Sequence, residues 1–212
     1  VTLSTAHNAQ QKLKESIYNH ISGIMHYLHK ETLLQLVDEI LRLNESLSGV
    51  ANIKAVLGNN EAVRNLYGYA LSIKAISEPK DCLLSQWIPL DACQHWFKLQ
   101  DSYNRADLLQ LSLTLDQDNK PILSAHVVEA KIGSPDLVKK AEDQIEASIH
   151  YLSKLFAPKH SNKSNNGYNR RYWWGQLHRA LVIRSHINQS EAEQLSIALE
   201  RLSEGDFTIH WT

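Results

Sequence analysis

The chain has 212 residues, of which 43% are hydrophobic and 21% are charged, and its formal net charge is −1. These values are ordinary for a globular protein, and no run of residues approaches the roughly 18 apolar positions that a membrane-spanning helix needs. Two cysteines, Cys82 and Cys93, lack metal-ligand spacing, and the N-terminus does not have the pattern of a signal peptide. We therefore expect a cytoplasmic protein with no membrane span, zinc site or disulfide.

The first 58 residues predict a helical extension. Apolar side chains recur at every third or fourth position through two segments between residues 4 and 48, which is the period of an amphipathic helix, and Gly49 and Gly58 interrupt the chain after these segments. We divide the chain into this N-terminal extension, residues 1–58, and a second domain, residues 59–212. The extension either supports the core or docks against another part of a longer polypeptide, from which we expect both ends of the chain to be cut.

A helix, a strand and a short helical turn come after the extension. The helix is expected over residues 61–76, where Glu61 in the first turn suits the helix dipole. A first strand is expected over residues 81–90, because Pro89 is suited to its end. Asp91 can then cap a short helical turn.

Residues 105–132 predict a β-hairpin. Two largely apolar runs, 106–115 and 121–132, flank the polar loop 116–120. The register follows from the apolar partners, since a slip of one residue would place leucines opposite Ser124 and His126 on the buried face. In this register the facing pairs are Leu115 with Pro121, Leu113 with Leu123, Leu111 with Ala125, Leu109 with Val127, and then Asp107 with Glu129.

The last of these pairs places two carboxylates together at the end of an apolar face. Their mutual repulsion makes burial costly unless a counter-charge is present. A hard divalent cation supplies that charge, so Asp107, Glu129 and the carbonyl of Ala130 are candidate ligands for Mg²⁺, with Mn²⁺ possible. Lys131 would then orient a metal-bound water or stabilise charge on a phosphate. The simpler alternative is a strand-end aspartate and a solvent-exposed Glu-x-Lys pair.

A long helix is expected after the hairpin, over residues 134–156. Ser134 can cap it and Pro135 suits its first helical position. Gln144 and Ser148 lie on a stripe apart from the main apolar face. Gln144 faces either the carboxylate site or solvent.

The basic residues of the chain are concentrated in one third of it. Residues 131–188 contain ten lysines and arginines against four aspartates and glutamates, a bias that suits a surface for a polyanion. Within this third, a polar loop leads into a helix where arginines and aromatic residues interleave, as in surfaces that hold phosphates and stack bases. Alternatively, the aromatic residues pack inside and the arginines are only solvated. The candidate nucleic-acid contacts are Lys159, Lys163, Arg170, Arg171, Trp174 and Arg179.

A final helix and an edge strand complete the expected elements. Ser190 and Glu193 form a capping box for a helix over residues 192–202, which Gly205 ends. Residues 207–211 alternate as a short strand that would join the edge of the sheet.

The pattern from Asp107 to the helix at residue 134 resembles the PD-(D/E)xK superfamily of restriction-endonuclease-like nucleases. Asp107, followed by Glu129-Ala130-Lys131 on the next strand, looks like the motif of that superfamily, although Ala106 stands where proline is usual. The resemblance covers roughly residues 61–211. It implies a mixed α/β fold, with a restriction-endonuclease-like core sheet flanked by helices, and a Mg²⁺-dependent phosphodiesterase site. It also implies that Glu61 and Gln144 support that site.

A looser resemblance concerns the residues around this motif. The runs Trp87-Ile88-Pro89-Leu90-Asp91 and Arg171-Tyr172-Trp173-Trp174 look like the nuclease module of prokaryotic DNA-defence helicases, including those of phosphorothioation-linked restriction. This resemblance implies DNA as the substrate and a parent protein or complex with an NTPase motor. No Walker-type phosphate loop occurs in the chain itself.

These expectations combine into a Mg²⁺-dependent deoxyribonuclease domain of a restriction or defence protein. One alternative is a non-catalytic module that uses the same fold to hold nucleic acid or a partner protein. Another is a phosphodiesterase for a small nucleotide, which the extent of the basic segment disfavours.

Overall fold

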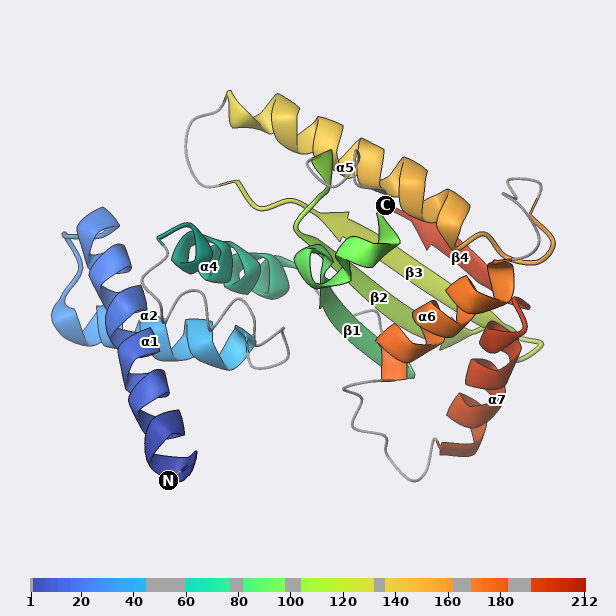
Figure 1. Ribbon diagram of the computed structural model, residues 1–212, viewed down its shortest axis with the longest axis horizontal. Coiled ribbons are helices and arrows are strands. Elements are labelled where there is room, and N and C mark those ends of the chain that lie inside the picture. The colour runs from blue at the N-terminus through green and yellow to red at the C-terminus, as the bar shows by residue number, and fades with distance from the viewer. Residues whose placement is uncertain are drawn as a thin grey trace. The chain divides into compact units, whose positions relative to one another are not determined.

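The computed structural model describes residues 2–44, 60–76, 82–97, 104–131, 136–161, 169–182 and 192–212 (Figure 1). The fold is mixed α and β. Two compact units make up the chain, the first Val1–Ser77 with Ala130–Gly133 and the second Glu78–Glu129 with Ser134–Thr212. The domain boundary that we expect between residues 58 and 59 stays a prediction. None of the described helices is long and apolar enough to cross a membrane.

The described residues of the first unit form three helices. They are α1 (Thr2–Ile24), α2 (Lys30–Asn44) and α4 (Asn60–Ala75), which confirms the helices expected from the apolar period. Each helix turns one apolar stripe towards the others, and together these stripes form one core. The buried residues of this core are Leu13, Ile17, Ile21, Leu33, Val37, Ile40, Val63, Leu66 and Ala70.

The second unit contains a four-stranded sheet with the strand order β1-β2-β3-β4. The strands are β1 (Leu84–Pro89), β2 (Leu108–Leu115), β3 (Pro121–Val128) and β4 (Thr208–Trp211). The first three pair antiparallel, and β4 pairs parallel to β3 at the edge, as the sequence predicts for the last strand.

The register of the central hairpin is the one expected from its apolar partners. Leu115 pairs with Pro121 and Leu109 with Val127, and the pairs between them also match. Asp116 shapes the loop, because its Oδ1 accepts hydrogen bonds from the backbone N–H groups of Asp118 and Lys120 at 2.9 and 2.8 Å. The loop therefore fixes the same register that the buried face favours.

The hairpin strands end sooner than the sequence predicts. Strand pairing stops at Leu108 and Val128, so the expected extension to residues 106 and 132 is wrong at Ala106, Asp107 and residues 129–131, and residue 132 lies outside the described residues. The physical reason on the β2 side is that side chains of the helix after the hairpin bond the backbone of residues 105 and 106. These backbone groups are satisfied without a further strand partner.

Three helices cover one face of the sheet (Figure 1). They are α5 (Leu137–Leu155), α6 (Arg170–Val182) and α7 (Ala192–Ser203), while the short 3₁₀ helix η1 (Leu90–Trp96) follows β1. Leu109, Leu111 and their facing partners on β3 project from this face, because strand side chains alternate. They pack against Leu152 and Phe156 of α5 and against the buried leucines of α6 and α7.

Candidate active site

Asp107 and Glu129 lie at the same end of the hairpin. They are the residues directly beyond the last strand pair, Leu108 with Val128. The carbonyl of Asp107 accepts a hydrogen bond of 2.9 Å from the backbone N–H of Leu90, which ties this position to the end of β1. Both side chains are half-buried, and Oε2 of Glu129 is shielded from solvent. The backbone thus brings two carboxylates to one end of the sheet.

Helix α5 holds the chain just before Asp107. Nε2 of Gln144 donates to the carbonyl of Arg105 at 2.9 Å, and Oγ of Ser148 accepts from the backbone N–H of Ala106 at 2.8 Å. Gln144 is 8% exposed and Ser148 1%, so this stripe of α5 is buried and not a solvated helix face. Sequence reasoning identified Gln144 but not the role of Ser148, although their spacing of four residues puts both on one face.

Arg105 is a second residue that sequence reasoning missed. Its guanidinium forms an ion pair with the carboxylate of Asp91, the first-turn acid of η1, and its side chain is only 14% exposed. The pair joins the segment before β2 to the segment after β1. A cation therefore lies two residues before Asp107 in the chain.

Ala130 and Lys131 continue the chain after Glu129 and belong to the first unit. Helix α4 comes so close to Ala130 that a Cβ on Gly68 would lie 2.8 Å from the Cβ of Ala130, which explains a glycine inside this helix. The side chain of Lys131 is exposed. The backbone of Glu61 is in the first turn of α4, but its side chain lies outside the described residues.

The basic and aromatic residues of α6 divide between the core and the surface. Trp174 is 6% exposed and its Nε1 donates to the carbonyl of Ala157 at 3.1 Å, so it is a core residue. Tyr172, at 54% exposure, is instead an aromatic side chain of this helix that solvent reaches. Arg171 and Arg179 are exposed as expected, whereas Lys163 lies outside the described residues.

Lys159 and Arg170 lie close together near the loop end of the hairpin. Nη1 of Arg170 donates to the carbonyl of Lys159 at 3.3 Å, and the N–H of Lys159 donates to the carbonyl of Gly205 at 2.9 Å. Gly205 precedes β4, whose first residue pairs with Ile122 at the start of β3. Eight strand residues at about 3.3 Å each separate this end from Glu129. The structure therefore does not bring these two basic residues to the carboxylates.

The available donors fit a hard cation better than a soft one. In the described part of the chain, no group of three or more His, Cys, Asp or Glu side chains could hold a metal ion. Mg²⁺ needs fewer protein ligands, because it keeps several waters and is commonly bound through one or two carboxylates. The carboxylates of Asp107 and Glu129 are oxygen donors of this kind.

Cys93, in η1, is not a candidate nucleophile. Burial raises the pKa of the Cys93 thiol to about 11. The thiol is therefore protonated at neutral pH and is a poor nucleophile.

Comparisons of the chain with protein-family models, with curated proteins and with solved structures found no significant match.

Proposed function

We propose that this chain is a Mg²⁺-dependent nuclease domain with a restriction-endonuclease-like core, which hydrolyses phosphodiester bonds in DNA. The observation that carries the proposal is the hairpin register, which brings Asp107 and Glu129 to the same end of the sheet. Glu129-Ala130-Lys131 follows in the order that the PD-(D/E)xK resemblance requires. We further propose that the domain works in the cytoplasm within a larger prokaryotic DNA-defence or DNA-processing protein that has an NTPase motor.

Each residue has a distinct role in this proposal. Asp107, Glu129 and the carbonyl of Ala130 hold Mg²⁺, with Mn²⁺ as a substitute. Glu61 helps to position the metal ion or its bound waters. The bound ion supplies positive charge that lowers the pKa of a coordinated water and stabilises a phosphate. Lys131 orients the attacking water through its ammonium group.

The residues around the carboxylates position them. Gln144 and Ser148 bind the backbone of Arg105 and Ala106, and thereby fix the chain just before Asp107, the residue that precedes β2. The hydrogen bond to Ser148 is buried and the one from Gln144 is partly buried, and together they hold the backbone at this point. Catalysis by fixed charges depends on such fixed placement.

The DNA backbone is held by the exposed basic residues of α6 and the loop before it. Arg171 and Arg179 are exposed, and Lys159 and Arg170 extend the basic surface. Arginines pair with phosphates without reading sequence, so we expect weak sequence preference and a strong dependence of affinity on salt.

A second candidate is a non-catalytic DNA-binding module. It is favoured by one observation, the separation of Lys159 and Arg170 from the carboxylate end of the sheet. In that case the basic surface holds DNA and the carboxylates have only local structural roles.

Cleavage of supercoiled plasmid DNA with Mg²⁺, Mn²⁺ or EDTA tests the nuclease proposal. We expect metal-dependent cutting that is lost in Asp107→Asn and Lys131→Ala, with nicked circles as the mark of an endonuclease. Asp118→Asn is the matched control, because Asp118 is exposed at the opposite end of the same hairpin. In a gel-shift assay Lys131→Ala should still bind DNA, whereas Arg171→Gln should bind less tightly and with a smaller salt dependence. DNA binding without cutting under any metal would instead support the binding module.

A further inference from the structure

A pocket of about 330 Å³ lies in the second unit, at the loop end of the hairpin. Its lining residues come from the start of β3, the last turns of α5, the loop that follows α5, and β4; those that matter here are Lys120, Ser153, His160, Phe207, Ile209 and Trp211. The volume is at the lower end of the range of about 300–1,000 Å³ that is usual for small-molecule sites. Eight residues of β3 separate Lys120 from Glu129, a distance of about 30 Å in an extended strand, whereas Trp211, which also lines the pocket, pairs with Ala125, four positions from Glu129. Neither Asp107 nor Glu129 lines the pocket.

One side of the pocket is apolar. Phe207, Ile209 and Trp211 alternate along β4 and project from the same face. Phe207 belongs to the core, and Ile209 and Trp211 pack against it while remaining partly accessible. This side offers a flat hydrophobic surface with an aromatic residue, which suits a planar ring.

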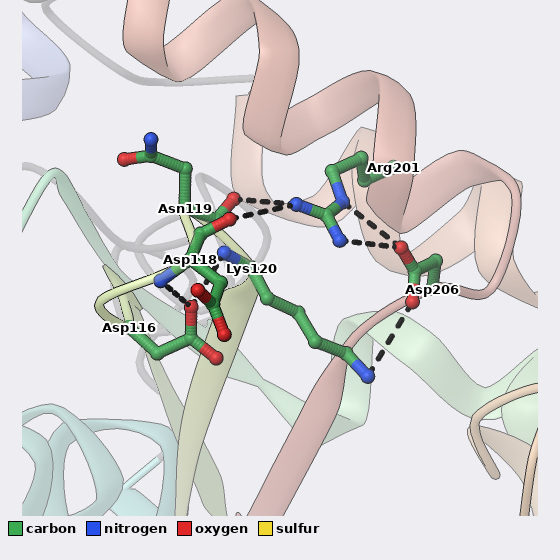
Figure 2. Close-up of polar contacts among 6 residues, drawn as sticks. All are labelled: Asp116, Asp118, Asn119, Lys120, Arg201 and Asp206. Atoms are coloured by element: carbon green, nitrogen blue, oxygen red, sulfur yellow. Dashed lines mark hydrogen bonds and ion pairs between the residues drawn. The ribbon is translucent and has the colours of Figure 1, made fainter.

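The other side carries polar groups with a positive charge. Nζ of Lys120 lies 3.4 Å from Oδ1 of Asp206, and Nη2 of Arg201 lies 2.8 Å from Oδ2 of the same carboxylate (Figure 2). The two cations therefore share the carboxylate of Asp206, and the ammonium group of Lys120, which has three N–H donors, can also donate to a ligand in the pocket. The exposed His160 and the hydroxyl of Ser153 add hydrogen-bonding groups.

We propose that this pocket binds a small anion that carries a planar ring, of the nucleoside monophosphate class. The ring lies against Ile209 and Trp211, and the phosphate is held by Lys120 and His160. Lys159 stands in the chain between the lining residues Pro158 and His160, and Arg170 donates to its carbonyl. These two basic residues would favour the approach of an anion to the pocket. The same chemistry occurs in a free nucleotide and at the phosphorylated end of a DNA strand.

Calorimetric titration with dAMP in EDTA tests the site without any contribution from cleavage. We expect dAMP to bind at least about tenfold more tightly than either inorganic phosphate or deoxyadenosine, because only dAMP uses both sides of the pocket. A 5′-phosphorylated oligodeoxynucleotide that competes with dAMP would identify a strand end as the natural source, and its failure to compete would identify a free nucleotide.

Two variants test the charged group and the open volume of the pocket. Lys120→Gln should weaken dAMP binding at least about tenfold through loss of a charged hydrogen bond. Ser153→Trp should abolish binding by filling the pocket. Lys154→Gln is the matched control, since Lys154 is an exposed lysine next to Ser153 that does not line the pocket. Circular dichroism would verify that each variant is folded.

The proposal would be overturned by the absence of dAMP binding up to about 10 mM, or by equal affinity for dAMP and phosphate. Unchanged affinity in both Lys120→Gln and Ser153→Trp would also overturn it. None of these outcomes depends on nuclease activity, so this site and the proposed function can fail separately.

Discussion

Gly205 is a position where only glycine fits. Its φ of +80° lies in the left-handed region, and a Cβ there would come within 2.4 Å of the indole ring of Trp174. Trp174 is buried and fixed by its hydrogen bond to Ala157, so the ring has little room to move. The turn between α7 and β4 therefore depends on this glycine.

Gly205→Ala should lower the free energy of unfolding by at least about 2 kcal/mol, because backbone strain and a ring clash combine. Gly175→Ala is the matched control, since Gly175 is exposed in α6 and a Cβ there meets nothing within 4 Å. That change should be neutral or stabilising by up to about 1 kcal/mol through helix propensity. Urea denaturation measures both, and equal effects of the two substitutions would contradict this explanation.

Asp206 predicts a pH dependence of stability. The hydrogen bond and charge of Arg201, with those of Lys120, hold the pKa of this carboxyl below its usual value (Figure 2). A lowered pKa in the folded state stabilises the protein above the pKa of the unfolded carboxyl, about 3.9, and this stabilisation is lost as the pH falls through the folded value.

Asp206→Asn should therefore reduce stability at neutral pH by a small amount, because the ion pairs face solvent. The difference from the unsubstituted protein should shrink in acid and with added salt. Thermal unfolding at several pH values measures this difference in stability. A difference that grows as the pH falls would contradict a lowered pKa of Asp206 in the folded protein.

At the scale of elements, the hairpin could be predicted because the residues that determine its register lie within the hairpin itself. Alternating leucines and the Asp116 loop specify one register, and that register brings Asp107 and Glu129 together. The start of β2 could not be predicted, because the residues before it bond side chains about forty residues away: Gln144 donates to the carbonyl of Arg105, and Ser148 accepts from the N–H of Ala106. For Trp174 the sequence left both a surface and a buried position open; in the structure its indole ring lies against Gly205, thirty-one residues further along the chain.

Ser148→Ala should destabilise the second unit by about 1–3 kcal/mol, since the buried N–H of Ala106 loses its acceptor. If Asp107 is catalytic, cleavage should fall more than DNA binding, because the substitution frees the backbone of Ala106, the residue before Asp107. Ser203→Ala on α7 is the control, as its exposed hydroxyl bonds a carbonyl of its own helix at 2.7 Å. Equal cleavage by both variants would argue against a positioning role for Ser148.

At the scale of the whole molecule, two separate hydrophobic cores organise the chain. Among the described residues, the core of the first unit and the core of the second share no side chain. The apolar stripe of α4 could be predicted from its period, but not which partner covers it. In the structure, Val63, Leu66 and Ala70 pack with α1 and α2.

Separate cores predict separable unfolding transitions. All five tryptophans lie after residue 77, so their fluorescence follows the second unit alone, whereas far-UV circular dichroism follows the helices of both. Leu66→Ala should lower the midpoint of unfolding seen by circular dichroism and leave the midpoint seen by fluorescence unchanged. Leu111→Ala should lower the midpoint seen by fluorescence. Each removes a fully buried leucine, at a cost of about 2–5 kcal/mol. A common shift of both signals in either variant would show that the two units unfold together.

The carboxylate pair is the centre of the functional account, and Mn²⁺ binding tests it most directly. Electron paramagnetic resonance counts the Mn²⁺ ions bound to the protein, with and without a DNA duplex. We expect binding that is lost in both Asp107→Asn and Glu129→Gln and retained in Asp118→Asn, because oxygen ligands at one end of the hairpin hold the ion. Unchanged Mn²⁺ binding in Asp107→Asn and Glu129→Gln would contradict a metal-dependent nuclease at this site.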